Sequence, residues 1–132
     1  MSTSTIDLTT CRVGAVAAVS DMARARAFYE GTLGLRPGDE QGDGHVVYPC
    51  GGGSTLLVYV SAHAGTATAT VAGFDVPDVE AAVADLGARG VAFERYDGPG
   101  VVTDDRGIMD AGAFRSAWFR DPDGNTFALA GR

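Results

Sequence analysis

Apolar residues occur along the chain in short runs, which glycine, serine and aspartate separate from one another. Most runs are rich in β-branched or aromatic residues, or alternate apolar with polar or small residues, and both patterns are typical of β-strands. The chain is therefore predicted to consist mainly of short strands. These predicted strands are 12–19, 45–48, 54–60, 66–75, 91–94, 113–120 and 126–130.

Two further segments carry apolar residues at helical spacing. In the first, Asp21 stands where an N-cap residue is expected and Gly34 where a left-handed residue would end the helix, which predicts a helix over 22–33. In the second, Asp78 takes the capping position and Gly90 closes the segment. Each predicted helix directly follows a predicted strand.

Turn residues define the connections. The sequence Asp121-Pro122-Asp123-Gly124-Asn125 lies between the last two strands and predicts a hairpin with a long loop, because proline presets a turn dihedral and glycine and asparagine tolerate positive φ. Gly51–Gly53 predicts a hairpin turn, since no Gly-Lys-Ser/Thr sequence follows that would make it a phosphate loop. Segment 96–112 is rich in glycine and aspartate and is predicted to be a long loop.

The two halves of the chain repeat the same pattern. Residues 19–22 at the start of the first helix match residues 76–79 at the start of the second, and each half reads as a strand, a helix and several short strands. Neither half is large enough to bury a core alone, so the halves are expected to pack together. We predict an α+β fold of two tandem βαβββ modules that form a curved mixed sheet around a cleft. The predicted divisions are a loose N-terminal arm (1–10), a first module (11–63) and a second module (64–132), in one compact domain.

Composition excludes several classes of function. The chain of 132 residues has a formal net charge of −7 and no basic stripe, which argues against a nucleic-acid partner. No apolar run approaches the roughly 20 residues of a membrane span, and no secretory signal is present, so we expect a cytoplasmic protein without a membrane partner. Cys11 and Cys50 lack the spacing of a zinc site and are interpreted as structural thiols.

The order of these motifs resembles a known superfamily. VSDMARARAFYEGTLGL in the first half, and VPDVEAAVADLGARGV and WFRDPDGN in the second, are similar to the vicinal oxygen chelate superfamily of glyoxalase I, bleomycin resistance proteins and extradiol dioxygenases. The resemblance extends from about Arg12 to Arg132. It implies the paired βαβββ fold and a cleft that in the enzymes of the group holds a divalent metal.

The resemblance also places the positions at which such enzymes hold the metal. They fall on Gly14, Leu57, Val71 and Ala128, none of which has a ligating side chain. The chain is therefore interpreted as a metal-less branch, with no cofactor. The histidines, His45 and His63, and loop aspartates such as Asp104, Asp105 and Asp110 leave a site with atypical metal ligands as an alternative.

Without a metal, the cleft is expected to bind a small molecule, as in relatives that sequester bleomycin-type antibiotics. Aromatic walls bind planar or cationic ligands by stacking, and the acidic balance of the chain weakly favours a cation, so we expect an aromatic or cationic ligand. Tyr59 has the same strand parity as Leu57 and is expected to face the cleft. The predicted ligand-binding residues are Tyr48, Cys50, Leu57, Tyr59, Val71, Phe93, Tyr96 and Trp118, with residues of the long loop.

Two other functions stay open. A metal-free, glyoxalase-like enzyme of isomerase, lyase or dioxygenase type would use acids and bases drawn from Tyr48, Cys50, Tyr59, Asp75 and Asp121. A subunit or regulatory module would have a collapsed cavity and no small ligand. The resemblance also implies a homodimer, for which the edge of strand 66–75 is a plausible pairing site.

Overall fold

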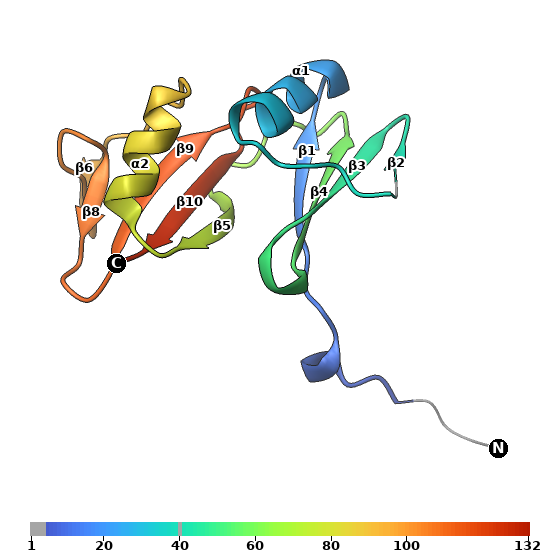
Figure 1. Ribbon diagram of the computed structural model, residues 1–132, viewed down its shortest axis with the longest axis horizontal. Coiled ribbons are helices and arrows are strands. Elements are labelled where there is room, and N and C mark those ends of the chain that lie inside the picture. Colours follow the sequence, from blue (N-terminus) through green and yellow to red (C-terminus); the bar gives the residue numbers. More distant parts are fainter. Residues whose placement is uncertain (1–4, 40) are drawn as a thin grey trace.

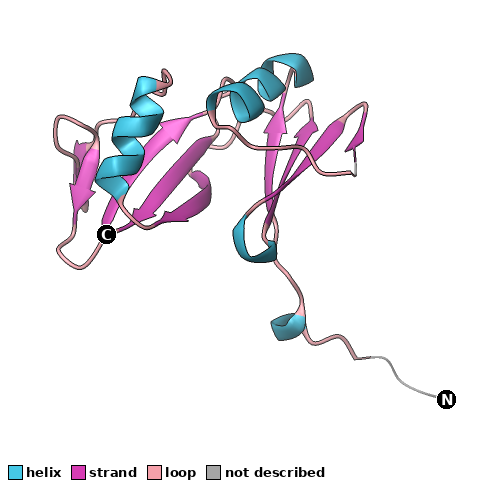
Figure 2. Ribbon diagram, in the orientation of Figure 1, coloured by secondary structure: helices cyan, strands magenta, loops and turns pink. Residues whose placement is uncertain are grey.

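The chain folds into two four-stranded sheets that lie side by side, with helical segments above both of them (Figure 1; Figure 2). The computed structural model describes residues 5–39 and 41–132. Residues 1–4 of the predicted N-terminal arm lie outside the described residues. The rest of the arm runs away from the first sheet and contains a short 3₁₀ helix, η1 (Leu8–Thr10).

The first sheet has the strand order β1-β4-β3-β2. Strand β1 (Ala15–Val19) pairs in parallel with β4 (Thr55–Val60), which pairs antiparallel with β3 (His45–Pro49). The short β2 (Gln41–Gly42) lies at the outer edge, antiparallel to β3. The turn from β3 to β4 is the 3₁₀ segment η3 (Gly51–Gly53), as the glycine run predicts.

The second sheet repeats this topology in the order β5-β10-β9-β8. Strand β5 (Thr70–Val76) is parallel to β10 (Thr126–Gly131), and β10 is antiparallel to β9 (Arg115–Arg120). Strand β8 (Ile108–Asp110) completes the sheet. In both sheets the first strand of the module is parallel to its last strand, so the predicted repeat and α+β class are confirmed.

Both helices begin at the predicted caps. The Asp21 carboxylate accepts a hydrogen bond from a first-turn backbone N–H at 3.1 Å, and α1 (Met22–Arg26) continues as a π-helical segment, η2 (Ala27–Thr32). The Asp78 carboxylate caps α2 (Val79–Ala88) in the same way, also at 3.1 Å. None of the helices in the described part of the chain has the length and apolar content needed to cross a bilayer.

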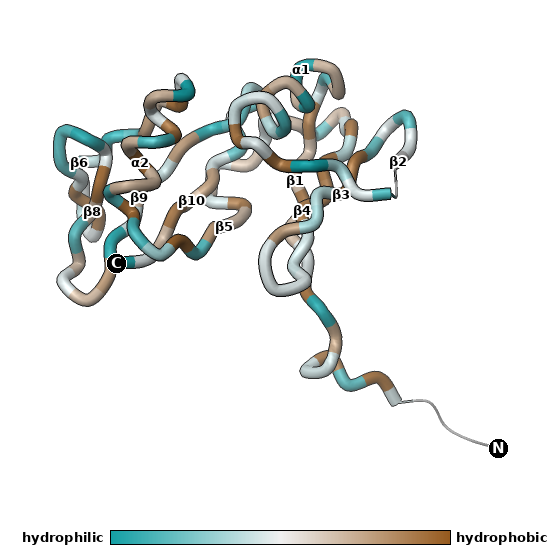
Figure 3. The backbone as a smooth tube through the Cα atoms, in the orientation of Figure 1, coloured by the Kyte–Doolittle hydropathy of each residue, from teal (hydrophilic) through white to brown (hydrophobic). Residues whose placement is uncertain are grey.

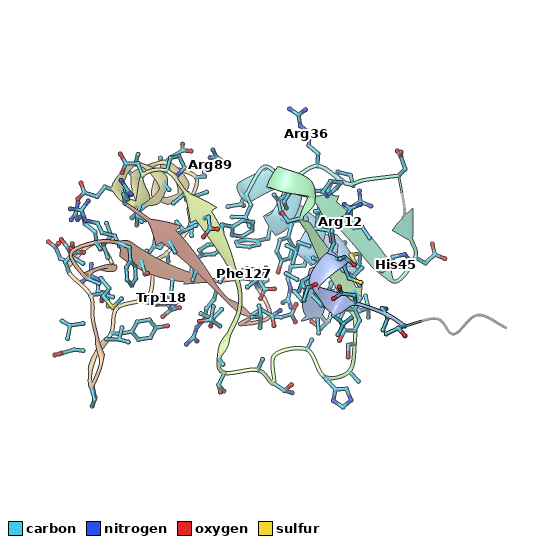
Figure 4. The ribbon with its side chains drawn as sticks, turned by 90° about the horizontal axis from the view of Figure 1, so that it is seen from below. Arg12, Arg36, His45, Arg89, Trp118 and Phe127 are labelled. Atoms are coloured by element: carbon cyan, nitrogen blue, oxygen red, sulfur yellow. The ribbon has the colours of Figure 1, made fainter. Side chains whose placement is uncertain are left out.

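One hydrophobic core joins the two modules. The Phe127 ring lies 5.9 Å from the ring of Tyr29 in the first module, and 5.7 and 6.1 Å from the rings of Phe119 and Phe74 in the second, measured between centroids. Phe127 accordingly sits near the middle of the molecule (Figure 4). Hydrophobic segments are concentrated on the strands and α2, whereas many connecting turns are hydrophilic (Figure 3). Burial of this shared core is the main contribution that keeps the halves together.

The turn between β9 and β10 also holds the modules together. The Asn125 side-chain amide donates a hydrogen bond to the Ala18 carbonyl oxygen at 2.8 Å. The Asp123 carboxylate accepts from the Ser20 hydroxyl at 2.6 Å and pairs with Arg24 at 3.1 Å. The predicted turn is therefore also the contact that docks the second module on the start of the first helix.

Two elements differ from the predictions. Residues 91–94 form no strand; Phe93 makes a single antiparallel bridge with Phe119. Segment 96–112, predicted to be a loop, contains β8 and a separate hairpin of β6 (Asp97–Gly98) and β7 (Val101–Val102). The strands there are two or three residues long, too short for the alternation of side chains to reveal them.

Candidate ligand-binding site

The site begins with the alternation of side chains along β9 and β10. Ala117 and Phe119 on β9 point to the buried face, as do Phe127 and Leu129 on β10. The residues between them point to the other face, where Trp118 pairs with the small Ala128. Trp118 consequently stands half-buried on the face of the sheet that the helices leave open.

A cavity of about 660 Å³ lies beside Trp118. Its size is within the range of about 300–1,000 Å³ that is usual for small-molecule sites. Its walls come from the segment that enters β5, the residues that lead into the β6–β7 hairpin, the hairpin itself, β9 and the start of β10. The lining residues are Thr68, Ala69, Thr70, Arg95, Tyr96, Asp97, Gly98, Val101, Trp118 and Thr126.

Two aromatic rings form a corner in this cavity. The centroids of Tyr96 and Trp118 are 5.5 Å apart, and their planes meet at 79°. The Glu94 backbone N–H donates to the Trp118 carbonyl oxygen at 2.8 Å. The Tyr96 backbone N–H donates to the Thr103 hydroxyl at 2.8 Å, and the Thr103 backbone N–H donates to the Tyr96 carbonyl oxygen at 2.9 Å. A planar molecule can stack on one ring while its edge meets the other, which is a favourable geometry for aromatic contacts.

The polar residues around the corner include one arginine, which only donates hydrogen bonds, and three threonines, whose hydroxyls both donate and accept them. Arg95 is exposed at the cavity wall, and the hydroxyls of Thr68, Thr70 and Thr126 line it. Asp97 supplies the only carboxylate among the described residues of this wall. The cavity can therefore offer an apolar stacking surface together with a guanidinium group and several hydroxyls.

A second cavity, of about 360 Å³, lies between the modules. Two of the predicted ligand-binding residues, Cys50 and Val71, line it together with Gly14 and Phe74. Burial raises the pKa of the Cys50 thiol, which makes it a weaker nucleophile at neutral pH. The structure thus separates the predicted set: Tyr96 and Trp118 share one cavity, and Cys50 and Val71 share another.

Leu57 and Tyr59 lie on the open face of the first sheet. Their neighbours on β4, Leu56 and Val58, are buried, and Leu57 itself is paired with Val16. The two side chains therefore share one face of β4, in agreement with their common strand parity. They are half-buried there and lie outside the two cavities just described.

Tyr48 and Phe93 lie on the opposite side from the predicted cleft. Tyr48 is fully buried in the core, and its hydroxyl donates to the Glu30 carboxylate at 2.8 Å. Burial and this hydrogen bond raise the pKa of Tyr48 well above its usual value, so it keeps its proton. Phe93 packs edge to face against the core residue Phe119 at 5.9 Å. Tyr48 is buried because it pairs with the buried Leu56 on β4. Tyr48 and Phe93 therefore belong to the core.

The positions that correspond to metal ligands in the resemblance do not form a metal site here. Gly14 and Val71 line the inter-module cavity, Ala128 lies next to Trp118, and Leu57 is on the first sheet. Within residues 5–39 and 41–132, no three histidine, cysteine, aspartate or glutamate side chains gather closely enough to hold an ion. The residues present therefore do not fit the metal that the resemblance implies.

Several cavity residues were not among the predicted ligand-binding residues. Asp97, Gly98 and Val101 belong to segment 96–112, whose residues were expected to contribute, but Arg95, Thr126, Thr68 just before β5 and Thr70 at its start were not foreseen. The alternation of β10 placed Thr126 on the same face as Ala128, and that signal was available in the sequence. The position of Arg95 in the cavity wall could not be predicted from the sequence, because it depends on the irregular path of the chain after α2.

These features define a class of protein with paired βαβββ modules and an open, partly aromatic cleft. The family model of the Glyoxalase/Bleomycin resistance protein/Dioxygenase superfamily matches residues 12–129, and the chain belongs to this superfamily. No match to the chain was found among curated protein sequences.

Solved structures with this fold include one that is described as an antibiotic binding protein. A glyoxalase/bleomycin resistance protein from Catenulispora acidiphila is 25% identical with a TM-score of 0.65, over 91% of this chain and 96% of that one. TnmS3, an antibiotic binding protein from Streptomyces sp. CB03234, is 28% identical with a TM-score of 0.64, over 88% of this chain and 90% of that one. A glyoxalase/bleomycin resistance protein from the same Streptomyces is 28% identical with a TM-score of 0.62, over 88% and 96% of the two chains.

Proposed function

We propose that this protein binds a small organic molecule, an antibiotic or a metabolite, in the cavity at Trp118 and sequesters it in the cytoplasm without a metal. The observation that carries the proposal is the Tyr96–Trp118 corner, which borders a cavity of about 660 Å³. The similarity to a protein described as antibiotic binding supports the same class of ligand.

The metal-free part of the proposal is supported by side-chain chemistry. Glycine, leucine, valine and alanine occupy the four positions that the resemblance assigns to ligands, and such side chains have no donor atom for a cation. The first test is elemental analysis of the purified protein after incubation with zinc, nickel, manganese or iron(II) and dialysis. Retention of one metal per chain would contradict this part of the proposal, and loss of all metal on dialysis would support it.

Ligand binding is tested by titration of planar aromatic antibiotics against the fluorescence of Trp118, the one tryptophan of the chain. Binding should change the emission, and the ligand should be recovered unaltered. Tyr96→Ala should weaken binding about tenfold, because one base-sized stacking contact is worth roughly 1–3 kcal/mol. Tyr59→Ala is the matched control, since Tyr59 lies on the first sheet, away from this cavity.

The same titration distinguishes the enzyme alternative. Sequestration predicts stoichiometric binding with no product, whereas an enzyme would convert the ligand at substoichiometric protein. Equal effects of Tyr96→Ala and Tyr59→Ala would place the ligand elsewhere and contradict the proposed site.

We also propose that the protein forms a homodimer. Val16, on the open face of the first sheet, is 49% exposed, and Val60, at the end of β4, is 45% exposed. A second copy would cover apolar surface of this kind. Light scattering coupled to size exclusion should give twice the chain mass, and a monomer at micromolar concentration would contradict it.

A further inference from the structure

The charged residues at the Trp118 cavity are not paired with one another. Between residues 85 and 120, the arginines other than Arg95 each make an ion pair: Arg89 with Asp85, Arg106 with Asp104, Arg115 with Glu80 and Arg120 with Glu94. In the described part of the chain Arg95 makes none, although acidic residues outnumber basic ones by 17 to 10. An unpaired guanidinium at a cavity wall, in a chain with an excess of carboxylates, leaves its donors available to a ligand.

The position of Arg95 relates it directly to the aromatic corner. It immediately precedes Tyr96, whose ring meets Trp118, and both residues line the cavity. Arginine presents five N–H donors in a planar fork that matches a carboxylate or a similar oxyanion. The hydroxyls of Thr68, Thr70 and Thr126 on the same walls can donate further hydrogen bonds.

We propose that the ligand of this cavity is a planar aromatic molecule with an anionic substituent, and that Arg95 binds that substituent while the aromatic ring stacks on Trp118 or Tyr96 and meets the other with its edge. This inference rests on the proposed binding function and specifies its ligand. A cationic ligand would find a single carboxylate, Asp97, on the same wall. The net charge of −7 attracts cations and repels anions at long range. Any selectivity of the cavity for an anion therefore has to come from groups in the cavity itself.

The experiment uses three probes that share one ring system: naphthoate, naphthamide and naphthylmethylammonium. Binding is followed in the whole protein by NMR, through the indole N–H resonance of Trp118, which is unique because the chain has one tryptophan. For the wild type at neutral pH we expect naphthoate to bind about three- to tenfold more tightly than naphthamide, as a partly exposed charge-assisted contact allows.

The matched pair of variants is Arg95→Gln and Arg36→Gln. Both remove one exposed positive charge, but Arg36 lies on the first module, far from Trp118 (Figure 4). Arg95→Gln should remove the preference for naphthoate and leave the affinity for naphthamide unchanged, whereas Arg36→Gln should keep the preference. Asp97→Asn removes the carboxylate of the same wall and should increase the preference for naphthoate.

Three results would overturn the inference. They are equal binding of naphthoate and naphthamide by the wild type, equal effects of the two arginine variants, and a preference for naphthylmethylammonium that Asp97→Asn removes. In each of these cases naphthamide still shifts the Trp118 resonance, so the proposed binding function stands. If no probe shifts that resonance, aromatic binding at this site fails, and the charge selectivity fails with it.

Discussion

The hydroxyl of Tyr29, on the first helix, donates a hydrogen bond of 2.5 Å to the Asp121 carboxylate, at the end of β9. The two residues are 92 positions apart in the chain and are both buried, at 0% and 5% exposure. Asp121 also accepts bonds from the side-chain amide of Asn125 and from two backbone N–H groups of its own turn. This carboxylate is therefore a structural group that connects the modules.

Tyr29→Phe tests the strength of this connection. The change removes one donor from a buried carboxylate, and a hydrogen bond to a charged group contributes about 1.5–3 kcal/mol. We expect the free energy of unfolding in urea to fall by about that amount. Tyr48→Phe is the control, since the buried Tyr48 hydroxyl also donates to a carboxylate, but that carboxylate, on Glu30, is partly exposed, so the change should have the smaller effect. A larger loss for Tyr48→Phe than for Tyr29→Phe would contradict the importance of the Tyr29–Asp121 hydrogen bond for stability.

At the same turn, Arg24 should contribute less to the free energy of unfolding than Asp123 does. The side chain of Asp123 is 6% exposed and accepts from the backbone N–H and hydroxyl of Ser20, whereas the side chain of Arg24 is 52% exposed. Asp123→Ala should lower the free energy of unfolding by about 1–2 kcal/mol, because it removes the hydrogen bonds that a largely buried carboxylate accepts from Ser20 and Arg24. Arg24→Gln should lower it by less than about 1 kcal/mol, as expected for an exposed ion pair. Chemical denaturation of both variants measures this difference, and equal losses would contradict it.

Glu30 gives stability a defined dependence on pH. Hydrogen bonds from Arg26 and from Tyr48 hold the pKa of Glu30 below its ordinary value of 4.5. A carboxyl with a lowered folded-state pKa stabilises the protein above the unfolded value, and this contribution is lost as pH falls through the folded value. Glu30→Gln should therefore be less stable than the wild type at neutral pH, by about 0.5–1 kcal/mol, since the group is partly exposed.

The measurement for Glu30 is urea unfolding of both proteins at neutral pH and at several values below pH 4.5. The difference between them should shrink as the pH falls, because the glutamine cannot titrate while Glu30 loses its charge. In an Arg26→Gln background, which removes the main cause of the shift, the difference between Glu30 and Gln should be smaller at neutral pH and should vanish at a higher pH. A difference that stays constant down to strongly acid pH would contradict the assignment.

Much of the fold was predictable because its signals are local. The caps Asp21 and Asp78, and the turn from Asp121 to Asn125, depend on backbone geometry that few residue types satisfy, so they define element ends without knowledge of the rest. The repeat of a capped helix after a strand then gave the module order. The faces of β9 and β10 followed from alternation, which placed Trp118 opposite the core.

The candidate site was less predictable because it depends on register and on irregular backbone. Parity within one strand separates two faces but does not say which face is buried, so Tyr48 was assigned to the cleft although its partner on β4 is the buried Leu56. The β6–β7 hairpin and the wall formed by Arg95 have no periodic pattern. Only the path of the chain around Trp118 brings these residues together.

Two glycines allow a final test of the packing at the end of β10. A Cβ at Gly131 would collide with the backbone carbonyl oxygen of Val76, on the neighbouring β5, where neither strand can move without loss of pairing. A Cβ at Gly87, in α2, would meet no atom within 4 Å, and the position is exposed. We expect Gly131→Ala to destabilise by about 1–3 kcal/mol, as overpacking does. Gly87→Ala should instead stabilise by about 0.5–1 kcal/mol, because alanine loses less backbone entropy in a helix.

Thermal unfolding of the two variants beside the wild type measures these opposite shifts. Gly131→Ala should lower the melting temperature and Gly87→Ala should raise it, although the covalent change is the same. A Gly131→Ala protein as stable as the wild type would show that β5 and β10 separate easily at this end.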